Sequence, residues 1–302
     1  MEFVTRVPKY KMKRKFLIIV VITILILTSG GTIYLVKPFK NTVVVAPNPD
    51  IKNTLTLILS PHFDDGVLSL GGLIAKQKNQ ILVTTFFTKR PTVVEHTNWD
   101  KISGFSNSDE AMFARIKENE EALIPLGAEI KNYDYPDFQY RSKNEDIEIK
   151  KEISKNISDI IDTYLNREIF IYGPATFGSQ ITHPDHQIVH DALMDVWKKT
   201  KKTNVHFAIY EDFPYVENFA LSNQGDLNTY LEQKEGVKFS ESLIELNKVE
   251  LSEKINTIDK YKSQVKAFMS FGENLGMLDK QFFQKRCKIL SPLMYGCEVV
   301  HI

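Results

Sequence analysis

Two short clusters of histidine and aspartate contain the side chains of this chain that could most readily do chemistry together. The first is HFDD at residues 62–65, in which one histidine and two adjacent carboxylates follow an apolar run. The second is HPDH at residues 183–186, which follows another apolar run and a loop. Imidazole nitrogen and carboxylate oxygen both suit Zn²⁺. The two clusters therefore predict a metal site shared between distant parts of the sequence.

The clusters contain enough groups for hydrolysis of an amide. A catalytic zinc site has three protein ligands and an open position at which water is activated. A carboxylate and an imidazole are then among the groups left over. The carboxylate can act as a general base, and the imidazole can stabilise an oxyanion or protonate a leaving amine. Other divalent metals also bind nitrogen and oxygen ligands, so zinc is the preferred metal among several.

Both clusters also have alternative interpretations. Asp64 or Asp65 could simply cap the helix that follows, because a helix N-terminus favours carboxylates. His190 lies four residues after His186, so the two could form a competing HxxxH metal pair. That pair would move the site one helical turn away from the end of the preceding strand, and we therefore favour the HPDH cluster.

The segments around the clusters alternate between strand-like and helix-like patterns. This alternation predicts an α/β fold, Rossmann-like and layered, with a largely parallel sheet flanked by helices. Ligand sites in such sheets lie just past the carboxyl ends of strands, where both clusters fall. The expected strands are 54–60, 81–88, 168–174 and 205–211, and the expected helices are 67–79, 109–126, 146–165 and 184–199.

The N-terminus has a different character. Residues 16–36 carry no charge, and as a helix they are long enough to cross a hydrocarbon core of about 30 Å. Basic residues concentrate before this segment, so the positive-inside rule predicts a basic cytoplasmic N-terminus at 1–15 and a single-pass transmembrane anchor at 16–36. A linker at 37–53 and an extracytoplasmic catalytic domain at 54–302 would follow. The alternative is a signal peptide whose cleavage releases a secreted protein.

The composition is that of an ordinary globular protein, with 43% hydrophobic and 25% charged residues. Lys and Arg together number 38, as do Asp and Glu, so no basic excess indicates a nucleic-acid partner. The two cysteines, Cys287 and Cys297, could form a disulfide in an extracytoplasmic domain or remain as buried thiols.

In its two clusters the chain resembles the PIG-L/LmbE-like deacetylases, which hydrolyse N-acetyl groups on glucosamine-containing glycans and glycoconjugates. The family's His-x-Asp-Asp turn, followed by paired glycines, is SPHFDDGVLSLGG at 60–72, and its His-x-Asp-His motif is HPDH at 183–186. The similarity spans roughly 54–270. The chain departs from many members at Gly66, where they have Glu, and at Ile181, where some have Tyr.

The resemblance implies a role for the histidine and the two aspartates of the first cluster and for the last histidine of the second. It makes His62, Asp65 and His186 the ligands of a zinc ion. It makes Asp64 the general base that takes a proton from water.

The resemblance also implies roles around this centre. His183 would be the oxyanion stabiliser or general acid, oriented by Asp185. Arg115 and Arg141 would bind substrate. The implied substrate is an N-acetylglucosamine-type glycan or glycoconjugate, which the predicted topology places outside the cytoplasm. Two other functions are alternatives: an amidase for another N-acyl group, and a non-catalytic glycan-binding protein of the cell envelope.

Overall fold

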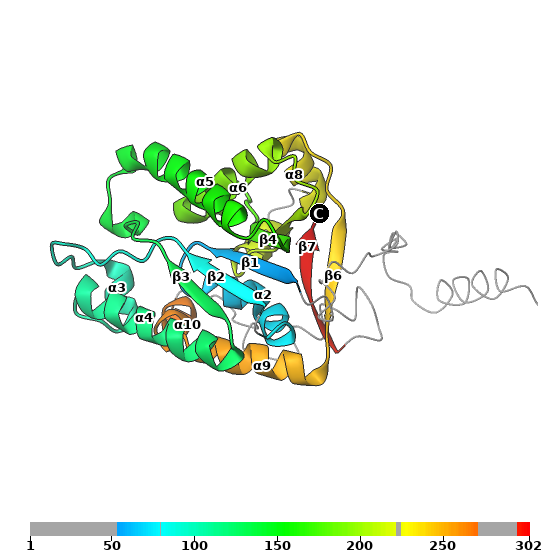
Figure 1. Ribbon diagram of the computed structural model, residues 1–302. Coiled ribbons are helices and arrows are strands. Elements are labelled where there is room, and N and C mark those ends of the chain that lie inside the picture. Colours follow the sequence, from blue (N-terminus) through cyan, green and yellow to red (C-terminus); the bar gives the residue numbers. More distant parts are fainter. Residues whose placement is uncertain (1–52, 79, 222–224, 271–294) are drawn as a thin grey trace, which may run out of the picture. The chain divides into compact units, whose positions relative to one another are not determined.

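The computed structural model describes residues 53–78, 80–221, 225–270 and 295–302. Its strands are β1 (Thr54–Ser60), β2 (Ile81–Thr85), β3 (Glu129–Asn132), β4 (Glu168–Pro174), β5 (Val205–Tyr210), β6 (Glu241–Leu246) and β7 (Gly296–His301). They form one sheet in the order β3-β2-β1-β4-β5-β7-β6 (Figure 1). The first five strands pair in parallel, whereas β7 pairs antiparallel with both β5 and β6.

Helices cover both faces of this sheet, with α5 and α6 on one face and α2, α4 and α9 on the other (Figure 1). The α-helices are α2 (Asp65–Lys76), α3 (Asn98–Ser103), α4 (Ser108–Leu123), α5 (Asp146–Thr163), α6 (Pro184–Lys199), α7 (Tyr215–Leu221), α8 (Leu227–Glu235), α9 (Lys248–Ile258) and α10 (Lys262–Ser270). Short 3-10 helices are η1 (Ile124–Leu126), η2 (Phe138–Tyr140) and η3 (Lys143–Glu145).

The predicted α/β fold with a largely parallel sheet is confirmed. All four expected strands and all four expected helices are present, although the strand expected at 81–88 ends at Thr85 and the helix expected at 67–79 spans Asp65–Lys76. Strands β3, β6 and β7 were not predicted from the sequence. The β3 sequence EIKN is mostly exposed, so it carries no apolar pattern.

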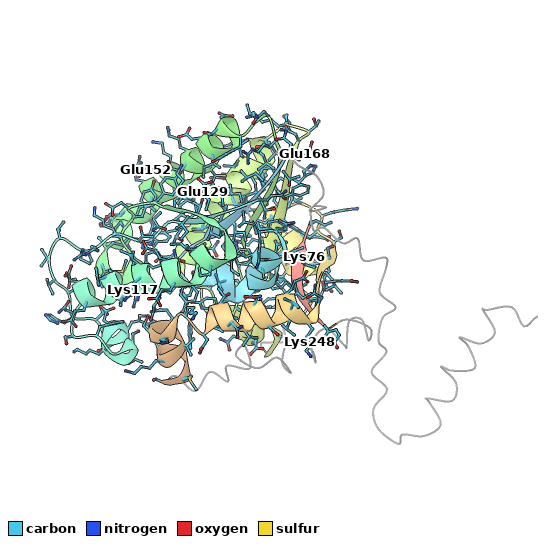
Figure 2. All side chains as sticks on the ribbon, turned by 60° about the horizontal axis from the view of Figure 1, so that its bottom comes forward. Lys76, Lys117, Glu129, Glu152, Glu168 and Lys248 are labelled. Atoms are coloured by element: carbon cyan, nitrogen blue, oxygen red, sulfur yellow. The ribbon has the colours of Figure 1, made fainter. Side chains whose placement is uncertain are left out.

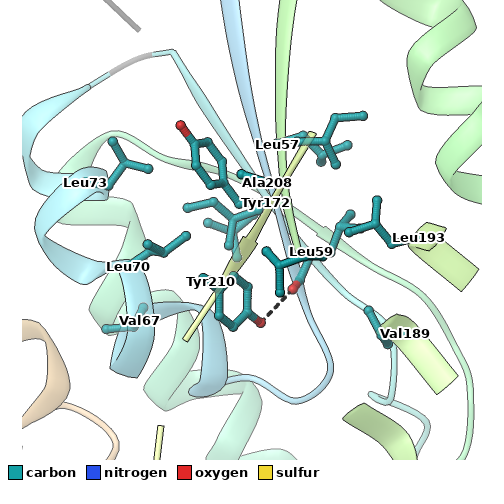
Figure 3. Close-up of a cluster of buried hydrophobic side chains, with 14 of the residues drawn as sticks. Leu57, Leu59, Val67, Leu70, Leu73, Tyr172, Val189, Leu193, Ala208 and Tyr210 are labelled. Atoms are coloured by element: carbon teal, nitrogen blue, oxygen red, sulfur yellow. Dashed lines mark hydrogen bonds between the residues drawn. The ribbon is translucent and has the colours of Figure 1, made fainter. Parts of the chain in front are cut away.

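The centre of the sheet is buried on both sides, which explains the near-continuous apolar run of β1. Figure 3 shows Leu57 and Leu59 of β1 packed among side chains of the neighbouring strands and helices. The hydroxyl of Tyr210 donates a hydrogen bond of 2.9 Å to the carbonyl of Leu59, so this large ring is buried with its polar atom satisfied. Charged side chains such as Glu152 on α5 and Lys117 on α4 lie on the outer surface (Figure 2).

Helix α2, which follows the HFDD cluster, is kinked at Leu70, whose φ of −123° and ψ of 23° are not helical. The backbone N–H groups of Gly72 and Leu73 donate to the carboxylate of Glu298 in β7, at 2.7 and 2.8 Å. Lys254 of α9 lies 2.6 Å from the same carboxylate, and both charged side chains are buried. The Glu298 carboxylate of this buried ion pair therefore accepts hydrogen bonds from backbone N–H groups next to the kink.

The predicted N-terminal segments 1–15 and 16–36, and all but the last residue of 37–53, lie outside the described residues. Among the described helices, none combines the length and the apolar character that a membrane crossing requires. Cys297 in β7 is disulfide-bonded, and Cys287 lies outside the described residues.

Candidate metal and catalytic site

The two clusters meet at the carboxyl ends of β1 and β4, which are neighbouring strands. After β1 the chain adds β2 and β3 on one side of this pair, and after β4 it adds β5 on the other side. HFDD follows β1 directly and enters the first turn of α2, while HPDH opens α6 after the loop that leaves β4. Open α/β sheets bind their ligands at such a switch point. The fold thus brings together residues more than 120 positions apart, as His62 and His186 are.

The three predicted metal ligands form a nearly equilateral triangle, which we call the ligand triangle. His62 Nδ1 lies 3.2 Å from Asp65 Oδ2 and 3.2 Å from His186 Nε2, and these last two atoms lie 3.1 Å apart. Tetrahedral coordination with Zn–N and Zn–O bonds of about 2.0–2.1 Å would separate ligand atoms by roughly 3.3 Å. The donor set and its spacing therefore fit one small divalent cation.

Each histidine of the triangle has a carboxylate at its other ring nitrogen. Asp185 Oδ2 lies 2.9 Å from His62 Nε2, and Asp212 Oδ2 lies 2.5 Å from His186 Nδ1. Both carboxylates are fully buried. A carboxylate in this position accepts the ring N–H and leaves the opposite nitrogen as the ligand. This arrangement is typical of metal-binding histidines.

Asp212 was not predicted as a site residue. It directly follows the predicted strand 205–211, so the rule that sites lie past strand ends could have found it. Its carboxylate contacts Nδ1 of His186, whereas Asp65 contacts Nε2 of the same ring. Asp212 therefore orients His186 and is not a fourth metal ligand beside the ligand triangle.

Carboxylates dominate the electrostatics of the triangle. Burial lowers the pKa of His186, but the carboxylates of Asp212 and Asp65 outweigh it and raise this pKa to about 10. Burial raises the pKa of Asp65, but His186 and His62 outweigh it and hold this pKa well below its usual range. The site therefore stabilises positive charge at the ligand atoms, either as protons or as a metal ion.

Asp64 is buried beside the triangle and lines the adjoining cavity. Burial first, and the charge of Asp65 second, raise the pKa of Asp64 to about 7. A carboxyl with a pKa near the working pH suits a general base, although a bound cation would lower this value. Asp64 makes no side-chain hydrogen bond to the start of α2, and Asp65 accepts the N–H of His62 at 2.7 Å. The capping interpretation thus does not describe these carboxylates.

His183 lies at the N-cap of α6 and also lines the cavity. Burial first, and the charge of His62 second, lower the pKa of His183 to about 4. The ring Nδ1 accepts the backbone N–H of Asp185 at 3.3 Å, which assigns the proton of the neutral ring to Nε2. His183 can therefore offer one N–H at neutral pH.

Asp185 was expected to orient His183, but its carboxylate lies against a different histidine. The Asp185 carboxylate lies 3.9 Å from His183 Nδ1, beyond hydrogen-bonding distance, but 2.9 Å from His62 Nε2. It also accepts the backbone N–H of Phe138 at 2.9 Å. Asp185 supports a ligand of the triangle, and only its backbone contacts His183 by a hydrogen bond.

The two arginines expected to bind substrate occupy different environments. Arg115 of α4 lines the cavity and donates to Asp100 at 3.2 Å. Arg141 does not line the cavity: its side chain is fully buried, and its Nη1 lies 2.5 Å from Asp185 Oδ1. The expectation that Arg141 binds substrate finds no support in this position, because its guanidinium pairs with the buried carboxylate of Asp185.

A cavity of about 160 Å³ adjoins the ligand triangle. Its polar side includes Asp137 and Gln139, in addition to the catalytic candidates. Its other side is apolar and is formed by residues of α3, α4, α10 and the strand ends, namely Phe63, Phe87, Trp99, Met112 and Phe268. A small polar group and an apolar neighbour could therefore be accommodated together.

The competing HxxxH pair is not formed. His190 is fully buried, with Nδ1 2.8 Å from the carbonyl of Pro174 and Nε2 3.2 Å from Glu235. Both ring nitrogens are therefore engaged away from the ligand triangle.

Comparisons with known proteins agree with this geometry. The family model PIG-L, described as GlcNAc-PI de-N-acetylase, matches residues 57–197, which include both clusters. None of the curated proteins matches the chain.

Two solved structures share the fold. The zinc-inhibited form of teicoplanin deacetylase Orf2 is 23% identical, with a TM-score of 0.64, and the match covers 82% of this chain and 96% of the other. The A40926 pseudoaglycone deacetylase is 20% identical, with a TM-score of 0.61, and the match covers 83% and 97%. The match of the family model at residues 57–197 confirms the predicted resemblance to the PIG-L/LmbE-like deacetylases.

Proposed function

We propose that this protein hydrolyses the N-acetyl group of an N-acetylated amino sugar, with a zinc ion held by His62, Asp65 and His186. The observation that carries the proposal is the ligand triangle, with the buried carboxylate of Asp64 beside it. The description of the PIG-L family and the names of the two deacetylases with the same fold support this reaction class.

The residues around the triangle can divide the reaction between them. When bound, a zinc ion would polarise the amide carbonyl and favour attack by water at neutral pH. Asp64 would accept the proton of the attacking water. The Nε2–H of His183 would donate to the oxyanion that develops on the carbonyl. The proton that Asp64 accepted would pass to the leaving nitrogen as the C–N bond breaks, and the products are acetate and an amine that takes up the remaining proton of the attacking water.

The same proposal includes the location of the reaction. An anchor at 16–36 would hold the catalytic domain outside the cytoplasm, where the substrate would be a glycan or glycoconjugate of the envelope or cell surface. The disulfide at Cys297 supports an oxidising compartment. Protease treatment of intact cells should digest the domain, and full protection would contradict this location.

Acetate release is the direct test of the activity. Zinc-loaded protein should release acetate from at least one member of a panel of N-acetylglucosamine-containing glycans and glycoconjugates. The matched control is Asp64→Asn, which keeps the size of the side chain and removes the base. Equal release by the two proteins would refute the assigned role of Asp64.

A parallel series of N-acyl glucosamines separates deacetylation from a wider amidase activity. The small cavity predicts that acetyl is preferred over long acyl chains. Preference for a long chain would favour the amidase, and absence of turnover with intact glycan binding would favour a binding protein.

A further inference from the structure

We propose that Arg141 is the positioning residue that holds the two histidine–aspartate clusters in register around the metal centre. This inference rests on the proposed metal site, but it concerns a residue outside the ligands and the cavity. Arg141 directly follows η2, in the segment that links β3 to α5.

The first link runs through Asp185. Arg141 Nη1 lies 2.5 Å from Asp185 Oδ1, and the other oxygen of this carboxylate lies 2.9 Å from His62 Nε2. Asp185 belongs to HPDH, whereas His62 belongs to HFDD. The arginine thus fixes a carboxylate of one cluster that, in turn, sets the orientation of a ligand in the other.

The second link is the stacking of the guanidinium. It lies 5.0 Å from the ring centroid of Phe87 and 5.7 Å from that of Phe138. The Phe87 ring packs against His62, and the Phe138 ring packs against His183, with centroids 5.9 and 5.7 Å apart. One planar cation therefore supports rings that touch a histidine of each cluster.

The rest of the side chain is held in place. Arg141 Nε donates to Asp146 Oδ1 at 2.9 Å, and Nη1 donates to the carbonyl of Pro136 at 3.0 Å. The side chain is fully buried. A lysine has no planar fork with which to repeat these contacts and the stacking together, so arginine is specifically required.

Zinc affinity tests this role without relying on turnover. We expect Arg141→Met to bind zinc about 10–100-fold more weakly than the wild-type protein, the range seen when the supporting partner of a metal ligand is removed. Arg141→Lys should fall between the two. Affinity would be measured on the full chain by competition with a chromophoric chelator, with the visible spectrum of the cobalt-substituted protein as a second readout.

Lys254→Met is the matched control, because it also removes a buried cation from an ion pair but leaves the cluster contacts intact. It should lower stability without changing zinc affinity or the cobalt spectrum. Added guanidinium ion should partly restore the zinc affinity of Arg141→Met. The effects of Arg141→Met and Asp185→Asn should not add in the double variant, because both act through His62.

The outcomes separate this inference from the proposed function. Equal zinc affinity and equal cobalt spectra for wild type and Arg141→Met would overturn the inference and leave the metal centre standing. A wild-type protein that binds no zinc would overturn both.

Discussion

Removal of Lys254 should destabilise the protein strongly at neutral pH. The Lys254 ammonium is fully buried, lies 2.6 Å from Glu298 and donates to the carbonyl of Ser69 at 2.9 Å. In Lys254→Met the Glu298 carboxylate keeps its two backbone N–H partners on α2 but loses its counter-charge. Removal of one partner of a buried ion pair typically destabilises by about 3–5 kcal/mol.

The burial of both charges sets the size of this effect. Lys254 and Glu298 are 0% and 4% exposed, so solvent neither screens the pair nor replaces the lost counter-charge. The carbonyl of Ser69 also loses its hydrogen-bond donor. We therefore expect a loss of about 4 kcal/mol at pH 7.

Urea unfolding at pH 7, followed by the fluorescence of the two tryptophans, measures this loss of unfolding free energy. A chelator should be present so that metal binding does not add to the stability. The double variant Lys254→Met/Glu298→Gln should be more stable at pH 7 than Lys254→Met alone, because no charge is left buried. A loss below about 1 kcal/mol at pH 7, or a double variant no more stable than Lys254→Met, would refute the assignment of a buried charged pair.

Three further predictions concern the site and its supports. Asp212→Asn should weaken zinc binding about 10–100-fold, measured by chelator competition, because His186 loses the carboxylate at Nδ1; unchanged affinity would argue against the orienting role. His190→Gln should leave zinc affinity unchanged in the same assay, and a large loss would revive the HxxxH pair. Gly72→Ala should lower the thermal midpoint and cost about 1–3 kcal/mol, because a Cβ at this position would lie 2.3 Å from Leu246 Cδ1; a midpoint equal to that of the wild type would show that the helix can move aside.

Only some of the residues of the candidate metal site and its surroundings could be predicted from the sequence. The HPDH and HFDD clusters could be predicted because their residue types are unusual together and because each follows a strand-like run. Asp212 had the same strand-end signal and a second carboxylate beside it, Glu211, but no histidine that would mark a metal-binding cluster. Arg141 lies more than 40 positions from either cluster in the sequence, and nothing in its neighbourhood indicates whether its side chain binds substrate or is buried.

The local pattern of the chain was sufficient for the alternating strands and helices, and for the two clusters of histidine and aspartate that could hold a metal ion. Apolar periodicity and side-chain chemistry are properties of neighbouring residues, so they can be read without a structure. Tertiary structure alone decided that Asp185 supports His62, that Arg141 is buried between the clusters, and that β7 lies between β5 and β6. These outcomes depend on distances between residues far apart in the chain, and a carboxylate's partner is set by those distances rather than by its neighbours in sequence.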